Sequence, residues 1–137
     1  MVLKKFKYKK VSSTNDIAIQ KIRQGYNAGI IISDEQTRGR GQHGKKWISN
    51  KGNLFCSVFF IINKKIQISR LVINNLRIVK KILSKHIKSK IKIKRPNDIT
   101  VHKKKICGNL NETLFYNDLK FLVIGIGINI VSSPNIR

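Results

Sequence analysis

The pattern of apolar and polar residues divides the chain into short strands and two helices. Apolar or alternating runs predict strands at residues 6–11, 29–33, 53–62, 99–101, 105 to about 114 and 121–130. Ile91 and Ile93 alternate with lysine in the same way before Pro96, and we expect Lys103 and Lys104 to form a turn between two strands. These segments are expected to build one sheet.

Two segments carry helical signals. Ser12 to Asn15 provide N-cap side chains for a helix that runs to about Gln24, and Gly25 follows it. From Ser69 to Ile87, apolar residues recur at intervals of 3 and 4, with lysines on the opposite face. Together with the strands, these helices predict an α/β domain of the α+β kind, in which helices pack on a mixed, mainly antiparallel sheet.

The composition adds a strong positive charge. The 137 residues include 29 Lys and Arg against 6 Asp and Glu, which gives a formal charge of +23. Such a charge attracts polyanions, so a basic nucleic-acid-binding domain is one alternative. The excess is mostly lysine and comes with much isoleucine and asparagine, and because all three share adenine- and thymine-rich codons, genomic bias is the favoured explanation. Only 7% of the residues are aromatic, mostly in apolar runs, so the sequence offers no stacking platform for bases.

The cysteines and the hydropathy pattern indicate a reducing, aqueous compartment. Cys56 and Cys107 are far apart and lack zinc-binding spacing, so we expect packed thiols rather than a metal site or a disulfide. The N-terminus has no apolar signal region, and no apolar run reaches the length of a membrane span. A cytoplasmic protein without membrane contact is expected.

The segment D-E-Q-T-R-G-R-G-Q-H-G-K-K-W, residues 34–47, contains G-x-G-x-x-G at Gly39, Gly41 and Gly44. A dinucleotide-binding turn would place this motif between a strand and a helix, with an acidic residue about 20 positions later. Here another strand follows, and residues 59–65 contain no acid. The motif therefore predicts either a solvated surface loop or a loop that folds over an anion, using main-chain N–H groups and arginines.

Three other stretches carry groups suited to ligand binding. Ser13 to Asn15 are either helix caps or ligand-binding side chains. In Lys94–Asp98, the acid is a candidate oxygen ligand for Mg²⁺, and Lys105 on the next strand could face the same place; the alternative is an ordinary turn and an exposed lysine. In Gly125–Asn129, two glycines weaken a strand unless something packs closely against its backbone.

Taken together and in order, these segments resemble the catalytic domain of biotin protein ligases. The resemblance rests on Ser13–Asn15 (S-T-N), Gln36–Trp47 (Q-T-R-G-R-G-Q-H-G-K-K-W), Lys94–Asp98 (K-R-P-N-D), Lys105–Gly108 (K-I-C-G) and Gly125–Asn129 (G-I-G-I-N). It spans most of the chain and implies the class II aminoacyl-tRNA synthetase/biotin ligase-like fold, in a single catalytic domain over residues 1–137. Lipoate ligases share that fold, but their arginine-rich double-glycine signature is missing.

The resemblance implies a two-step reaction. Biotin's carboxylate would attack ATP, with Mg²⁺, to give biotinyl-5′-AMP, and a lysine of the biotin carboxyl carrier protein would then accept the biotinyl group. Lys105 and Arg40 would be catalytic, and Asp98 would help to hold Mg²⁺. Biotin would contact Ser13, Thr14, Gln36, Gly39, Arg40 and Gly108. ATP or the adenylate would contact Gly41, Gln42, Gly44, Lys45, Trp47, Lys94, Asn97 and Asn129.

The sequence departs from the family pattern at several positions. Gln42 stands where the family often has an arginine that retains the adenylate, so a leakier intermediate would follow. Arg95 replaces a tryptophan, and Asn109 and Asn111 interrupt a strand that is normally apolar. His43 is expected to be a loop residue rather than a general base.

The largest departure is length. Because the chain begins at the catalytic domain and ends soon after G-I-G-I-N, we expect it to lack an N-terminal DNA-binding domain and a C-terminal β-barrel. Specific DNA binding is therefore not expected. An inactive, truncated remnant is the main alternative to an active ligase, and a homodimer formed through sheet edges is left open.

Overall fold

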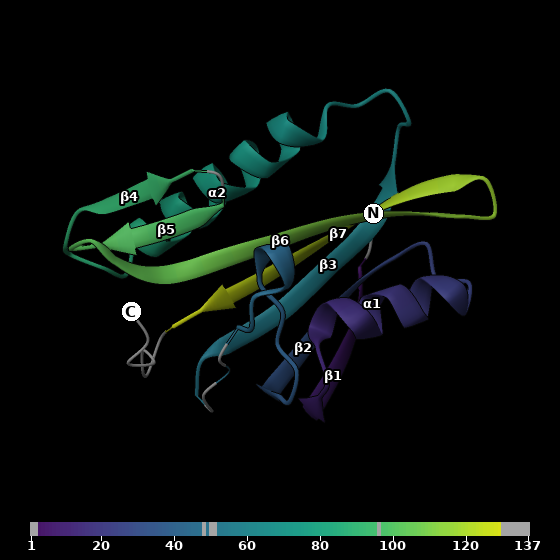
Figure 1. The fold of residues 1–137 in the computed structure, drawn as a ribbon, viewed down its shortest axis with the longest axis horizontal. Coiled ribbons are helices and arrows are strands. Elements are labelled where there is room, and N and C mark those ends of the chain that lie inside the picture. Colours follow the sequence, from purple (N-terminus) through teal and green to yellow (C-terminus); the bar gives the residue numbers. More distant parts are fainter. Residues whose placement is uncertain (1–2, 48, 50–51, 96, 130–137) are drawn as a thin grey trace.

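Seven strands form one sheet in the computed structural model, which describes residues 3–47, 49, 52–95 and 97–129 (Figure 1). The elements are β1 (Lys4–Val11), α1 (Thr14–Arg23), β2 (Ala28–Gln36), the short 3₁₀ turn η1 (Gln42–Gly44), β3 (Leu54–Ile62), α2 (Ile68–Ser84), β4 (Ile91–Lys94), β5 (Asp98–Val101), β6 (Lys104–Tyr116) and β7 (Leu119–Ile128). The strand order is β1-β2-β3-β7-β6-β5-β4. The pair β1 and β2 is parallel and the other neighbours are antiparallel, which confirms the mixed, mainly antiparallel sheet.

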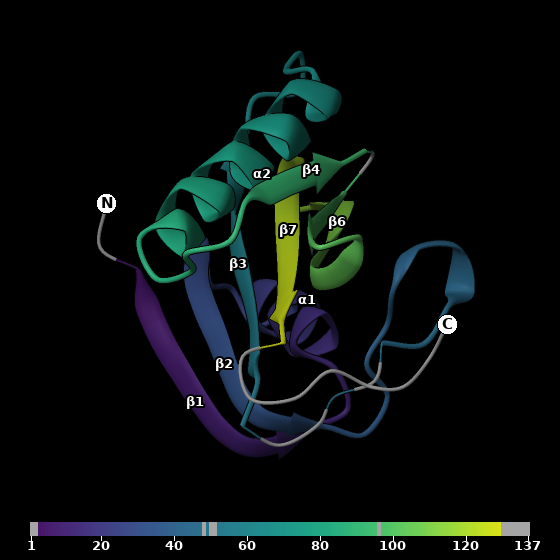
Figure 2. The same cartoon turned by 90° about the vertical axis from the view of Figure 1, so that its left-hand side faces the viewer.

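The two helices cover opposite faces of the sheet. Ala18 and Ile22 of α1 pack with Phe59, Phe121 and Val123, whereas α2 packs over the even-numbered residues of β7 on the other face. Figure 2 shows α2 to the left of β7 and the loop between β2 and β3 to its right. That loop and α1 therefore share one face, which we call the α1 face.

The first helix begins as the sequence predicts. Ser13 Oγ accepts a hydrogen bond from Asp16 N at 3.3 Å, which satisfies a free N–H group of the first turn. Gly25 follows the helix with a φ of 101°, a conformation that glycine adopts without steric cost. The second helix ends three residues before the predicted Ile87.

Both cysteines are buried and free, as expected. Burial raises the pKa of Cys56 to about 11. Burial, followed by the electrostatic effects of Cys56 and Asp98, raises the pKa of Cys107 to about 12. The neutral thiols therefore act as packed side chains under ordinary conditions.

Two tight turns differ from the prediction. His102 and Lys103, with φ values of 51° and 64°, form the turn between β5 and β6, so Lys104 is already the first residue of β6. Asn117 and Asp118, with φ values of 50° and 62°, connect β6 to β7 and were missed. Two successive left-handed residues make the turn whose twist matches antiparallel strands, and Asn and Asp tolerate that conformation.

Asn109 and Asn111 do not break β6, which runs through both positions from Lys104 to Tyr116. The predicted last residue of the final strand, Ile130, lies outside the described residues. Within the described ranges, neither helix is long and apolar enough to cross a membrane.

Candidate active site

A pocket of about 370 Å³ opens on the α1 face, where β6 and β7 pass the beginning of α1. Gly108 and Leu110 of β6, with Gly125 and Gly127 of β7, form its floor. The glycine–arginine loop, residues 37–47, supplies a facing wall and lies in front of these strands (Figure 1). Three segments distant in sequence therefore enclose one space.

The pocket exists because glycine replaces larger side chains along β7. On the α1 face this strand presents Phe121 and Val123 and then, at the next two alternate positions, Gly125 and Gly127. Side chains two residues apart point to the same face of a strand. The first two pack beneath α1, and the two glycines leave the space above them free for other groups.

Two side chains use that space to approach the backbone closely. A Cβ atom at Gly127 would lie 2.5 Å from Trp47 Nε1, and one at Gly108 would lie 2.9 Å from Trp47 Cζ3. A Cβ atom at Gly125 would lie 2.5 Å from Asn15 Oδ1. The prediction that something packs closely on the glycine strand is therefore confirmed.

The beginning of α1 is tied to the neighbouring strands by polar groups. Thr14 N donates a hydrogen bond to Gln36 Oε1 at 2.8 Å, and Gln36 Nε2 donates to Ser49 Oγ at 3.0 Å. Ser57 Oγ, fully buried on β3, lies 2.5 Å from Asn15 Oδ1 and 2.7 Å from Thr14 Oγ1. These contacts place the S-T-N segment on the pocket wall beside Gln36.

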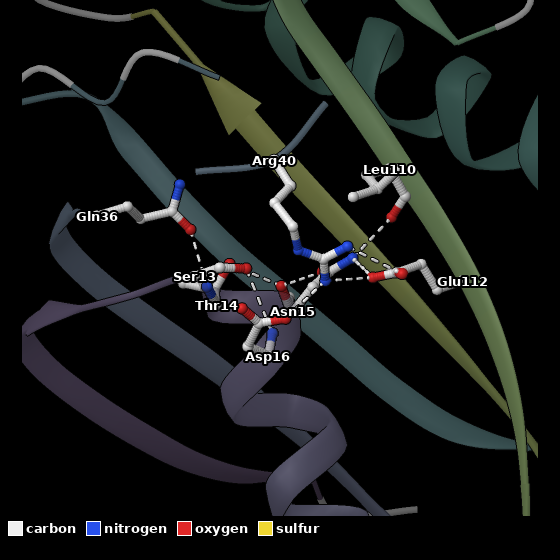
Figure 3. Close-up of polar contacts among 9 residues, drawn as sticks. Ser13, Thr14, Asn15, Asp16, Gln36, Arg40, Leu110 and Glu112 are labelled. Atoms are coloured by element: carbon white, nitrogen blue, oxygen red, sulfur yellow. Dashed lines mark hydrogen bonds and ion pairs between the residues drawn. The ribbon is translucent and has the colours of Figure 1, made fainter. Parts of the chain in front are cut away.

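Arg40 crosses from the loop to the sheet and meets two carboxylates (Figure 3). Its Nη1 donates to Glu112 Oε2 at 3.0 Å, and its Nη2 donates to Glu112 Oε1 at 2.7 Å, so the planar guanidinium matches the carboxylate with two bonds. Nη2 also lies 2.8 Å from Asp16 Oδ1 on α1. The glycine–arginine loop is thereby joined to both β6 and α1.

The pKa values of this group follow from its contacts. Burial of the Glu112 carboxyl opposes ionisation, but hydrogen bonds from Arg40 and Asn15 and the charge of Arg40 outweigh that effect and lower the pKa of Glu112. The hydrogen bond to Glu112, the charges of both carboxylates and the hydrogen bond to Asp16 outweigh burial and raise the pKa of Arg40. The charged forms are therefore the stable ones.

Lys105 stands on the other side of the pocket, near the beginning of β6. Its Nζ lies 3.0 Å from Asp98 Oδ1 and 5.1 Å from the ring centroid of Trp47. A cation over the face of an indole is attracted by the ring electrons. Lys105 and Asp98 therefore face the same place, one of the two arrangements that the sequence allowed.

The described lining of the pocket is strongly cationic. Asp98 is its acidic member, and it faces six basic side chains: Arg40, Lys45, Lys46, Lys94, Arg95 and Lys105. Positive charge in a concave site concentrates anions. Among the described residues, no group of three His, Cys, Asp or Glu side chains could hold a metal ion by itself.

Most residues chosen from the sequence line this pocket. These are Ser13, Thr14, Gln36, Arg40, Gly41, Gln42, Lys45, Trp47, Lys94, Asn97, Asp98, Lys105 and Gly108. In the described structure, three others lie beside it rather than on its wall. Gly39 is buried inside the loop, where a Cβ atom would collide with Trp47 O. Gly44 has a φ of 73° in the loop turn, and Asn129 donates to Lys105 O at 3.5 Å at the end of β7.

The sequence did not identify two partners of Arg40. Glu112 and Asp16 are separated from Arg40 by 72 and 24 residues, so no local motif joins them. The available signal was scarcity, because Glu112 and Asp16 are two of only 6 acids in a chain with 29 basic residues. A buried or half-buried acid in such a chain requires a cation nearby.

Comparison with known proteins agrees with this geometry. A model described as the biotin/lipoate A/B protein ligase family matches residues 8–129. The chain belongs to that family. The bifunctional ligase/repressor BirA of Escherichia coli is 34% identical over 125 residues, which cover 87% of this chain and 38% of that protein.

Solved structures give the same relationship. A biotin protein ligase from Leishmania major in complex with biotinyl-5-AMP matches with a TM-score of 0.78 and 30% identity, over 99% of this chain and 61% of that one. A biotin protein ligase from Aquifex aeolicus in complex with biotin and ATP matches with a TM-score of 0.74 and 30% identity, over 96% and 55%. The chain thus has the fold of biotin ligases and spans under two thirds of the length of these relatives.

Proposed function

We propose that the protein is a biotin ligase that activates biotin with ATP. The carboxylate oxygen of biotin attacks the α-phosphate of ATP, the bond to the pyrophosphate leaving group breaks, and biotinyl-5′-AMP forms. The amine of a lysine on the biotin carboxyl carrier protein then attacks the biotinyl carbonyl and releases AMP. The observation that carries this proposal is the meeting of the S-T-N, glycine–arginine, K-R-P-N-D and K-I-C-G segments around one cationic pocket.

Lys105 has the position and charge for the first step. The reaction brings a carboxylate next to a phosphate, and both are anions that repel each other. A cation fixed between them stabilises the charge that develops in the transition state. Lys105 does so from the wall opposite Arg40, and Asp98 at 3.0 Å holds its ammonium group in the pocket.

The other walls suit the two ends of the adenylate. Ser13, Thr14 and Gln36 offer hydroxyl and amide groups for the ureido ring of biotin. Gly108, which has no side chain, lets Trp47 lie close to the floor, and Trp47 offers an aromatic ring to adenine. Gly39, Gly41, Gln42, Gly44 and Lys45 belong to the loop, which covers the intermediate and excludes water. Lys94, Asn97 and Asn129 complete the nucleotide side.

Mg²⁺ fits this pocket as an ion held mainly by the phosphates of ATP. Mg²⁺ in such sites commonly uses one or two carboxylates together with phosphate oxygens and water. Asp98 supplies one carboxylate on the wall, so it would hold the ion. The metal would neutralise part of the phosphate charge.

The test is biotin-dependent exchange of labelled pyrophosphate into ATP. We expect exchange by the wild-type protein and a loss of about 100-fold or more in Lys105→Ala, because a cation at the reacting centre is removed. Lys104→Ala is the matched control, since Lys104 is exposed and lies outside the described pocket lining. Transfer of biotin to purified carrier protein then tests the second step.

Two results would count against the proposal. A folded wild-type protein without exchange or biotin binding would support an inactive remnant. Equal exchange in Lys105→Ala and Lys104→Ala would remove Lys105 from the chemistry. Trp47 is the one tryptophan in the sequence and lines the pocket, so its fluorescence reports binding directly.

A further inference from the structure

A continuous set of polar contacts runs from the buried floor of the sheet to the glycine–arginine loop. Ser57 on β3 contacts Asn15 at 2.5 Å, Asn15 Nδ2 donates to Glu112 Oε1 at 3.0 Å, and both oxygens of Glu112 accept from Arg40. Figure 3 shows these side chains from α1, β6 and the loop converging on one another. Each member is held by the one before it, from the most buried to the least.

Glu112 is fixed more firmly than an ordinary surface acid. Asn15, which orients it, is 3% exposed and also donates to Leu110 O at 3.2 Å. The side chain of Asn15 lies against Gly125, where a Cβ atom would meet Asn15 Oδ1 at 2.5 Å. Because Asn15 cannot move without disturbing β3, β6 and β7, the carboxylate that it holds keeps one orientation.

Arg40 is the loop's charged anchor to this fixed acid. Two of the three ion pairs found among the described residues belong to Arg40. The backbone contacts Gly41 N to Lys45 O at 2.7 Å and Trp47 N to Gly39 O at 2.8 Å join the loop to itself. Only an arginine matches a carboxylate with two parallel bonds, so this contact sets direction as well as distance.

The charge balance indicates what Arg40 does in this state. Its single positive charge faces the two negative charges of Glu112 and Asp16, so the three groups together are net negative. An arginine in that setting is already neutralised, and its two terminal nitrogens are occupied. The positive charge that the pocket offers to a phosphate therefore comes from its other cations, of which Lys105 is itself paired with Asp98. These cations are Lys45, Lys46, Lys94, Arg95 and Lys105.

We propose that Glu112, oriented by Asn15, is a positioning residue that holds Arg40 and thereby keeps the glycine–arginine loop closed over the pocket. Asp16 supports Arg40 from the solvent side with one bond and a half-exposed carboxylate. For the ligand that the loop covers, the inference rests on the proposed function. We call the contact between Glu112 and Arg40 the latch. It forms without a ligand, so its effect on the loop can be tested in the ligand-free protein.

Trypsin measures closure directly, because residues 37–47 contain Arg38, Arg40, Lys45 and Lys46. Cleavage of a loop under native conditions follows the population of its open form. We expect Glu112→Gln to accelerate cleavage at Lys45 and Lys46 by about tenfold, in the range of coupling measured for paired charged groups. Asp16→Asn is the matched control, with less than about threefold acceleration. Mass spectrometry identifies the cleaved bonds.

A double-mutant cycle separates this latch from a general loss of stability. Arg40→Gln and the double variant Arg40→Gln/Glu112→Gln should be cleaved within about threefold of Glu112→Gln, because all three remove the Arg40–Glu112 contact and loss of Arg40 also removes the single bond to Asp16. Multiplying effects in the double variant, or unchanged cleavage in Glu112→Gln, would overturn the proposal. Should Glu112→Gln not fold by circular dichroism, Arg40→Gln alone carries the test, because Arg40 lies in a loop outside the core.

Measurements with ligands distinguish a failure of this inference from a failure of the proposed function. With biotin and ATP present, Trp47 fluorescence should show faster ligand release from Glu112→Gln than from the wild-type protein. One outcome is that the wild-type protein binds neither compound while the Glu112→Gln variant is still cleaved faster in the loop. That outcome would refute the ligase proposal and leave the latch intact. Binding that is equal in both proteins, together with equal cleavage, would refute the latch and leave the ligase proposal intact.

Discussion

The α1 face of the sheet has a packed half and an open half, although the same strands build both. In the packed half, Phe59, Phe121 and Val123 fill the space under α1. In the open half, Gly125 and Gly127 occupy the corresponding positions of β7, and the pocket lies above them. Strand periodicity sets which residues face α1, and side-chain size then decides whether that region becomes core or site.

The two halves also differ in what holds them together. The packed half depends on the burial of apolar side chains. These side chains are uncharged, and the hydrophobic effect that stabilises them has little directional preference. The open half depends on hydrogen bonds and ion pairs between Asn15, Glu112 and Arg40. Stability and function should therefore respond separately to substitutions in the two halves.

Filling the open half is expected to have the largest effect. Gly127→Val places a branched side chain where a Cβ atom already lies 2.5 Å from Trp47 Nε1, so the indole must leave its place. We expect pyrophosphate exchange to fall by about 100-fold or more, because displacement of positioning groups costs that much. The midpoint of thermal unfolding should change little, since valine favours strands over glycine.

Thr113→Val is the control for that substitution. Thr113 is an exposed position on β6, so the same side chain enters the same sheet without touching the described pocket. Exchange should remain within about twofold of wild type, as for most surface substitutions. Normal exchange in Gly127→Val would show that the glycine floor is not needed for the chemistry.

A large-to-small substitution in the packed half is expected to lower stability and to leave pyrophosphate exchange nearly unchanged. Val123→Ala removes two fully buried methyl groups between α1 and the sheet. We expect the free energy of unfolding to fall by about 2 kcal/mol, as for other large-to-small core substitutions. Urea unfolding measures the loss, and exchange per folded molecule should stay within about threefold. A larger drop in exchange than in stability would mean that the halves are coupled.

As the pH falls, the glycine–arginine loop of the open half should be released before the packed half unfolds. Glu112 faces Arg40 and Asn15, and Asp16 also faces Arg40. Because the pKa of Glu112 is lowered, its contribution is fully present above the ordinary carboxyl range and is lost as the pH falls through the lowered value. Hydrogen exchange of residues 38–47, corrected for intrinsic rates, should accelerate severalfold while α1 and β7 stay protected.

Glu112→Gln provides the reference for the acid experiment. Its loop should already exchange rapidly at neutral pH and should show a much smaller acid effect, since the titrating carboxyl is gone. Simultaneous loss of protection in the loop, α1 and β7 would indicate that the two halves open as one unit.

The fold was largely predictable from local periodicity. The runs from residue 53 to 62 and from 121 to 130 are apolar, and β3 and most of β7 lie there. The hairpin at Asn117 and Asp118 was missed because its left-handed backbone depends on two residues that are also common in ordinary loops. The turn at His102 and Lys103 was displaced by one residue because lysine, its second residue, gives no signal for the left-handed conformation, although histidine tolerates it.

The site was predictable to the extent that its motifs are local. That Lys105 faces the same place as Asp98 was one of the two arrangements left open by the sequence, and the two side chains lie 3.0 Å apart across the β5–β6 pair. The contact of Arg40 with Glu112 could not be predicted, because it depends on how the loop folds back over a strand 72 residues away. Glu112 lies on the α1 face because it is two residues from Leu110 on β6, a position that becomes informative only once the register is known.

The smallest effect is expected at His43, which lines the open half without a role in either proposal. Its φ of 57° and ψ of 38° are left-handed, so the loop needs a residue that tolerates this conformation. His43→Asn keeps that tolerance and removes the imidazole. Pyrophosphate exchange should stay within about twofold of wild type, and its dependence on pH between about 6 and 8 should keep the same shape. A changed pH profile would assign the imidazole a proton-transfer role. The loop would then contribute a reacting group to the open half in addition to covering it.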